Sequence, residues 1–84
     1  MKIIWLTVAW EDYLYWQLHD KKTVVKINSL LKDIQRDPFD GIGNPEALKH
    51  SLSGWWSRRI NLSDRLVYRV EDHSIIILQC RKHY

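Results

Sequence analysis

The chain begins with a short apolar run and then spaces its apolar residues at helical intervals. Residues 2–6 (KIIWL) predict a first strand. A helix should follow, with Thr7 as its N-terminal cap. Two apolar stripes with helical spacing run along it: Trp10, Leu14 and Leu18, and Ala9, Tyr13 and Trp16.

A second helix is predicted after Asp20, whose side chain can cap it. Its apolar stripe consists of Val24, Ile27, Leu31 and Ile34. Asp37 precedes Pro38, and a residue before proline avoids the helical region, so the helix should end there. Two helices joined so tightly predict an antiparallel helical hairpin.

Beyond a glycine- and proline-rich loop at residues 38–45, the period of the apolar positions changes from helical to two. A strand is predicted at residues 47–51, before a turn at Ser53–Gly54. Three further strands are expected at Trp56–Ile60, Arg65–Glu71 and Ser74–Cys80. Short connections favour antiparallel neighbours. The predicted fold class is α+β, a single domain over residues 1–84. An N-terminal strand and the helical hairpin pack on one face of a mainly antiparallel sheet.

The alternation also assigns the strand side chains to two faces. One set should meet the helices: Leu66, Tyr68 and Val70, with Trp56 and Ile60 from the strand before. The opposite set should face away from them: Arg65, Val67 and Arg69, with Ser57 and Arg59. Because the helices cannot cover both faces, one face should present arginines to solvent.

Charge and composition narrow the class of partner. Hydrophobic residues make up 45% and charged residues 27%, which argues against disorder. The formal net charge is +3, and all of this excess lies in residues 44–84, which favours a polyanionic partner. A single cysteine excludes a disulfide framework and favours a reducing compartment. No membrane span or targeting segment is visible, so we expect a cytoplasmic protein without membrane association.

The second half of the chain contains groups suited to metal-free RNA cleavage. They are a carboxylate, Glu46, an imidazole, His83, and the cations Lys49, Arg58, Arg59, Arg65, Arg69 and Arg81. A base can deprotonate a ribose 2′-hydroxyl, cations can stabilise the phosphate, and an acid can protonate the leaving oxygen. Spacing alone leaves other interpretations open. Glu46 also fits a solvated loop acid, the arginines a solubilising face, and His83 a frayed tail.

Other reactive residues point to ordinary packing. The four histidines lack metal-ligand spacing, so neither a metal nor a cofactor is expected. Cys80 alternates with Ile76 and Leu78, as a core residue would. Trp5, Trp10 and Trp16 should pack in the core. Trp55 and Trp56 should point to opposite faces, which leaves one of them free to meet a base or a partner.

The series PEALKH (45–50), LSGWWSRRI (52–60), RLVYRV (65–70) and HY (83–84) resembles the YoeB toxin family of the RelE/ParE superfamily of type II toxin–antitoxin systems. The resemblance covers essentially all 84 residues. It implies a RelE-like fold and an mRNA interferase that cuts messenger in the ribosomal A site. It also implies a homodimer, neutralised by a YefM-like antitoxin. Trp55 stands where phenylalanine is common, and Lys82 where tyrosine often precedes the last two residues.

The resemblance also implies roles for individual residues. Glu46 matches the general base, His83 the general acid, and Arg65 the arginine that stabilises the transition-state phosphate. Three more positions match: the supporting cations Lys49 and Arg59, and Tyr84, which helps place the nucleotide. Two alternatives remain at this point. They are a non-catalytic toxin of the superfamily that binds gyrase and a small basic RNA-binding module.

Overall fold

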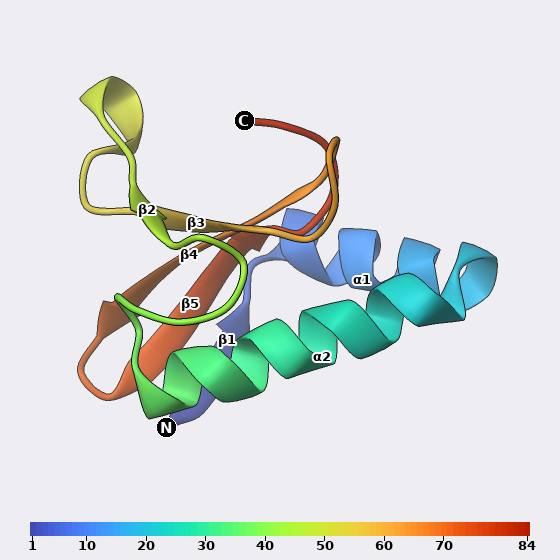
Figure 1. Ribbon diagram of the computed structural model, residues 1–84, viewed down its shortest axis with the longest axis horizontal. Helices are drawn as coiled ribbons and strands as arrows, with labels where there is room; N and C mark the ends of the chain where they lie inside the picture. The colour runs from blue at the N-terminus through green and yellow to red at the C-terminus, as the bar shows by residue number, and fades with distance from the viewer.

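The computed structural model describes residues 1–84 and contains one five-stranded sheet with two helices on one side (Figure 1). The elements in chain order are β1 (Lys2–Trp5), α1 (Thr7–His19), α2 (Lys21–Arg36), β2 (Glu46–Ala47), the 3₁₀ turn η1 (His50–Leu52), β3 (Trp56–Arg59), β4 (Arg65–Glu71) and β5 (Ser74–Gln79). The strand order is β1-β5-β4-β3-β2; β1 pairs with β5 in parallel and all other pairs are antiparallel. The predicted α+β class and mainly antiparallel sheet are confirmed.

The caps of the two helices differ. Asp20 caps α2 as predicted, because its carboxylate accepts from the backbone N–H groups of Lys22 and Thr23. Thr7 is not a cap: it is the first residue of α1, and the capping position belongs to Leu6, which offers no side-chain acceptor. The short connection through Asp20 places the helices as the predicted antiparallel hairpin (Figure 1).

Only one of the two apolar stripes of α1 faces the core. Ala9 and Trp16 are buried, and Tyr13 packs against them. Trp10, Leu14 and Leu18 are exposed, so the prediction that Trp10 packs in the core is wrong. The predicted stripe of α2 is confirmed at Ile27, Leu31 and Ile34, with Val24 partly buried. The rest of the core consists of Leu30 on α2 and of residues in the strands or directly after them: Ile60, Leu66, Tyr68, Ile75, Ile77 and Cys80.

The first strand after the loop is shorter than predicted. β2 consists of Glu46 and Ala47, and not of residues 47–51. The chain leaves the sheet because His50 adopts a positive φ of 59° and begins the η1 turn, which extended pairing cannot accommodate. Glu46 is therefore on a strand at the sheet edge, and not in the preceding loop.

The face opposite the helices is partly covered. The backbone N–H of Arg65 donates to the carbonyl of Lys82 (3.1 Å), and the N–H of Lys82 donates to Asp64 Oδ1 (2.6 Å). These bonds hold the chain after β5 against β4, and it doubles back over this side of the sheet (Figure 1). Val67, predicted to face solvent, is consequently fully buried.

Candidate functional site

The sheet register places the glutamate and two arginines on the face opposite the helices. Glu46 on β2 is opposite Ser57 on β3, and Ser57 is opposite Val67 on β4. Directly opposed residues point to the same face, and so do residues two apart on one strand. Arg59 and Arg65, which are opposite each other, therefore share the face of Glu46. The predicted arginine face is confirmed for these two residues.

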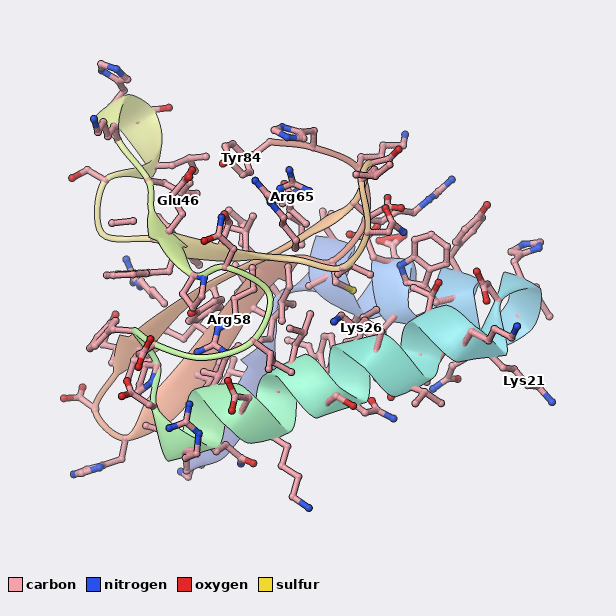
Figure 2. All side chains as sticks on the ribbon, viewed as in Figure 1. Lys21, Lys26, Glu46, Arg58, Arg65 and Tyr84 are labelled. Atoms are coloured by element: carbon pink, nitrogen blue, oxygen red, sulfur yellow. The ribbon has the colours of Figure 1, made fainter.

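The C-terminal segment brings a tyrosine to the glutamate. Tyr84 Oη donates to Glu46 Oε1 over 3.2 Å, across 38 positions of sequence. Figure 2 shows Glu46, Tyr84 and Arg65 together on the side of the sheet away from the helices. Because the same segment is bonded to β4 at Arg65, its path is determined by two contacts on the sheet. Three predicted site residues from distant parts of the chain thus lie in one region.

Arg59 and Arg65 have no carboxylate partner among the ion pairs of the structure. The Arg65 guanidinium donates only to main-chain carbonyls, those of Asn61 (3.0 Å) and Asp64 (3.4 Å). Like charges directly opposite each other on neighbouring strands are destabilising. Two unpaired, opposed arginines beside a glutamate form a surface that an anionic group can neutralise.

His83 and Lys49 lie at the edges of this surface. His83 is exposed, and its ring lies 4.8 Å from that of Tyr84, but it makes no hydrogen bond to Glu46. Lys49 is exposed beside an open groove of about 650 Å³. The polar residues that line this groove are Glu46, Lys49, His50, Ser51 and Tyr84. The sequence did not identify His50 as part of this groove.

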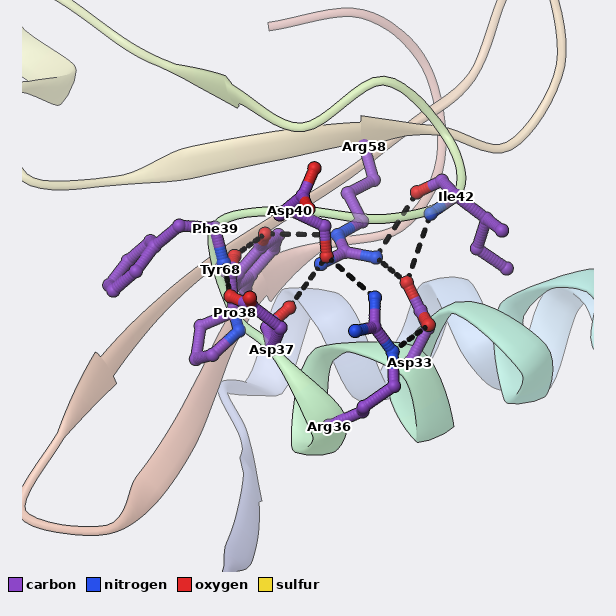
Figure 3. A network of polar contacts seen from close by, with 9 residues as sticks. All are labelled: Asp33, Arg36, Asp37, Pro38, Phe39, Asp40, Ile42, Arg58 and Tyr68. Carbon is purple, nitrogen blue, oxygen red and sulfur yellow. Dashed lines mark hydrogen bonds and ion pairs between the residues drawn. The ribbon is translucent and has the colours of Figure 1, made fainter.

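Arg58 does not belong to the exposed cations with which the sequence grouped it. It is fully buried on the helix side of the sheet, where the five N–H donors of its guanidinium meet five acceptors (Figure 3). These acceptors are Asp33 Oδ2, Tyr68 Oη and the carbonyls of Asp37, Asp40 and Ile42, at 2.5–3.3 Å. Arg58 is two residues from both Trp56 and Ile60, which were predicted to face the helices. This spacing could have placed Arg58 on the helix side from the sequence alone.

The Arg58 network fixes the loop that leads to Glu46. Arg36 donates to Asp33 (2.9 Å) and to the carbonyl of Asp40 (3.1 Å). The pKa of Asp33 is held well below its ordinary value by hydrogen bonds from Arg36, Arg58 and the backbone N–H of Ile42. The N–H of Arg59 then donates to the carbonyl of Gly43 (2.7 Å), three residues before Glu46. The loop is thereby tied to β3 by the Arg58 side chain on the helix side and by a backbone hydrogen bond at the strand edge.

Cys80 takes the packing role that the sequence indicated, and Trp55 and Trp56 point to opposite faces as predicted. Cys80 is buried, and burial raises the pKa of its thiol to about 12, so it stays protonated at neutral pH. Trp56 packs against Phe39, and Trp55 lies against Arg69 on the other face. No three His, Cys, Asp or Glu side chains are grouped so that they could hold a metal ion. Neither helix is long and apolar enough to cross a bilayer.

The family model of YoeB-like toxins of bacterial type II toxin–antitoxin systems matches residues 5–84. This chain belongs to that family. Toxin YoeB of Escherichia coli (strain K12) is 60% identical over 84 residues, which cover 100% of both chains. Two solved structures from Staphylococcus aureus are each 52% identical and cover 100% of this chain and 98% of theirs. One is a heterotetrameric YoeB–YefM toxin–antitoxin complex (TM-score 0.93), and the other is a YoeB dimer (TM-score 0.94). The resemblance to YoeB toxins seen in the sequence is confirmed, and the chain is a YoeB toxin of a toxin–antitoxin system.

Proposed function

We propose that this YoeB toxin is an endoribonuclease that cuts mRNA in the ribosomal A site, with residues 1–84 acting as one toxin domain in the cytoplasm. The observation that carries the proposal is the 3.2 Å hydrogen bond from Tyr84 to Glu46. It joins the C-terminal segment to the glutamate on the face that holds Arg59 and Arg65. A carboxylate, cations and an imidazole then surround one site, as metal-free RNA cleavage requires.

In the proposed reaction, Glu46 removes the proton from a ribose 2′-hydroxyl. The resulting oxygen attacks the adjacent phosphorus and forms a 2′,3′-cyclic phosphate. The bond from phosphorus to the 5′-oxygen breaks, and His83 gives that oxygen a proton, so the new end is a 5′-hydroxyl. Arg65 stabilises the charge that gathers on the phosphate oxygens, because its guanidinium has no carboxylate partner to neutralise it.

Three residues support these steps in the proposal. Arg59 lies directly opposite Arg65 and adds positive charge at the same phosphate. Lys49, at the groove beside Glu46, contacts the RNA backbone. Tyr84 places the nucleotide; its bond to Glu46 must open or shift when RNA binds, because the glutamate is then needed by the 2′-hydroxyl. The exposed position of His83 leaves its ring free to turn toward the leaving oxygen.

The experiment is a cleavage assay with purified protein and programmed ribosomes. We expect new mRNA ends at the A-site codon, also in the presence of a chelator, and we expect them to carry 5′-hydroxyl groups. A protein that only binds RNA would give no new ends. A gyrase-binding toxin would also give none, but it would inhibit DNA supercoiling in a parallel reaction.

The likeness to the S. aureus structures also supports two protein partners. We propose that a YefM-like antitoxin neutralises this toxin, and that two copies form a homodimer. The exposed apolar stripe of α1, composed of Trp10, Leu14 and Leu18, is the surface we propose for the dimer. Replacing Leu14 with glutamate should shift the protein to a monomer in sedimentation analysis; an unchanged dimer would exclude this surface.

A further inference from the structure

A tryptophan and an arginine are stacked on the same face as Glu46. Arg69 Cζ lies 4.9 Å from the centroid of the Trp55 ring. Arg69 follows Val67 by two residues on β4, so it shares the face of Val67 and of Glu46. It lies about 7 Å along β4 from Val67, and Arg65 lies the same distance away on the other side. Val67, which is in register with Ser57 and Glu46, therefore has an arginine two residues away on each side along β4.

The Arg69 guanidinium is held in place and still accessible. Its Nη2 lies 2.8 Å from Glu71 Oε2, and its side chain is 41% exposed. Trp55, which is only partly exposed, supports it from one side. RNA-binding proteins stack unpaired bases on aromatic rings and on guanidinium planes. A planar group that is already immobilised loses little conformational entropy when a base stacks on it.

Arg69 contributes little to the fold. Its ion pair with Glu71 joins two exposed groups, and such pairs add little stability. Its Nε is shielded from solvent and has no hydrogen-bond partner, whereas all five donors of Arg58 are bonded. A structural arginine usually has its buried N–H groups satisfied. Arg69 is therefore not bonded into the fold as Arg58 is, and the exposed part of its guanidinium stays available to a ligand.

We propose that Arg69, stacked on Trp55, forms a second nucleotide subsite, where an unpaired base next to the cleaved linkage stacks on the guanidinium. This inference rests on the proposed ribonuclease function. The ligand is a base and not a phosphate, because the carboxylate of Glu71 beside the guanidinium repels an anion. Arg65 and Arg69 lie two residues on either side of Val67, so RNA with its reacting phosphate at Arg65 can carry a nearby base to Arg69 by passing around the C-terminal segment that covers Val67.

The test measures cleavage rate against the concentration of programmed ribosomes, and so separates KM from kcat. Base stacking contributes about 1–3 kcal/mol per base, so Arg69→Ala and Trp55→Ala should raise KM roughly 5- to 150-fold, with kcat unchanged. Arg69→Lys keeps the positive charge but removes the planar guanidinium group, so its KM should resemble that of Arg69→Ala. Trp55→Phe keeps a ring and should retain most of the affinity. Phe39→Ala, which removes an exposed aromatic ring on the helix side, is the matched control and should leave KM unchanged.

A modified messenger makes the test specific to the base. An abasic nucleotide is placed in turn on each side of the cut linkage. At one of the two positions it should raise KM for the wild-type protein and cause no further increase in Arg69→Ala, because the two changes remove the same contact.

Three results would overturn the subsite: a wild-type KM in Arg69→Ala, full rescue by Arg69→Lys, or additive losses from the abasic nucleotide and Arg69→Ala. If the wild-type protein cuts no mRNA, the proposed function is wrong. In that case, fluorescence anisotropy with a labelled single-stranded RNA tests the subsite separately. The subsite predicts that wild-type protein binds intact RNA more tightly than abasic RNA and that Arg69→Ala does not; equal affinities in the wild type would overturn it.

Discussion

Arg58 and Arg59 are adjacent in the sequence but have opposite surroundings. Arg58 points to the helix side, is fully buried and bonds to five acceptors. Arg59 points to the other side, is exposed and has no ion pair. One step along a strand therefore separates a residue that holds the fold from one available to a ligand. The identity of the side chain does not distinguish these roles, but the face of the sheet does.

The largest effect should come from removing the buried arginine. Arg58→Met should lower the free energy of unfolding by about 3–5 kcal/mol, because it removes the charged partner of Asp33 and leaves the carbonyls of Asp37 and Ile42 without a donor. Urea denaturation followed by circular dichroism measures this loss. Arg59→Met is the matched control and should change stability by less than about 1 kcal/mol. Equal losses in the two variants would remove the distinction between the faces.

Replacing Arg65 should affect cleavage strongly and stability little, which is the reverse of what is expected for Arg58. Arg65→Ala should reduce the single-turnover rate of mRNA cleavage about 10²- to 10³-fold, as expected for loss of a group that stabilises transition-state charge. Its side chain donates only to two carbonyls at the surface, so the unfolding midpoint should hardly move. Cleavage at the wild-type rate by a folded Arg65→Ala protein would refute the assignment of this residue.

A smaller effect should appear in the pH dependence of stability. The pKa of Asp33 is lowered in the folded protein, so its ionised form stabilises the fold above its ordinary value near 4. That contribution is lost as the pH falls through the lowered pKa. Asp33→Asn should therefore be less stable than the wild type at pH 7, and the difference should shrink toward pH 2. Chemical denaturation at both pH values measures it; a constant difference would show that the charge of Asp33 is irrelevant.

Local rules predicted most of the elements correctly. Asp20 caps α2, Pro38 follows its end, and alternation placed Leu66 and Tyr68 against the helices. Two of the errors came from long-range contacts. Val67 is buried because a segment about 15 residues further along doubles back, and α1 exposes Trp10 because its other stripe packs on the sheet.

In the candidate site, too, local patterns predicted one feature, and a long-range contact determines another. Period-two alternation predicted that Arg59 and Arg65 share a face, whereas their direct opposition follows from the register of two adjacent strands. The contact between Tyr84 and Glu46 does not follow from any local pattern, because it depends on the path of the whole C-terminal segment. The family resemblance implied roles for both residues at one site, but it did not predict this contact. The roles of Glu46, His83 and Tyr84 in catalysis stay predictions.

The central claim is that the arginine face performs chemistry on the 2′-hydroxyl of RNA. The most direct test is single-turnover cleavage of a messenger with one 2′-deoxy nucleotide at the cut position, bound to programmed ribosomes. The proposed reaction predicts that cleavage at this linkage is abolished, while an unmodified messenger in the same reaction is cut. Cleavage of the 2′-deoxy messenger at the unmodified rate would contradict it.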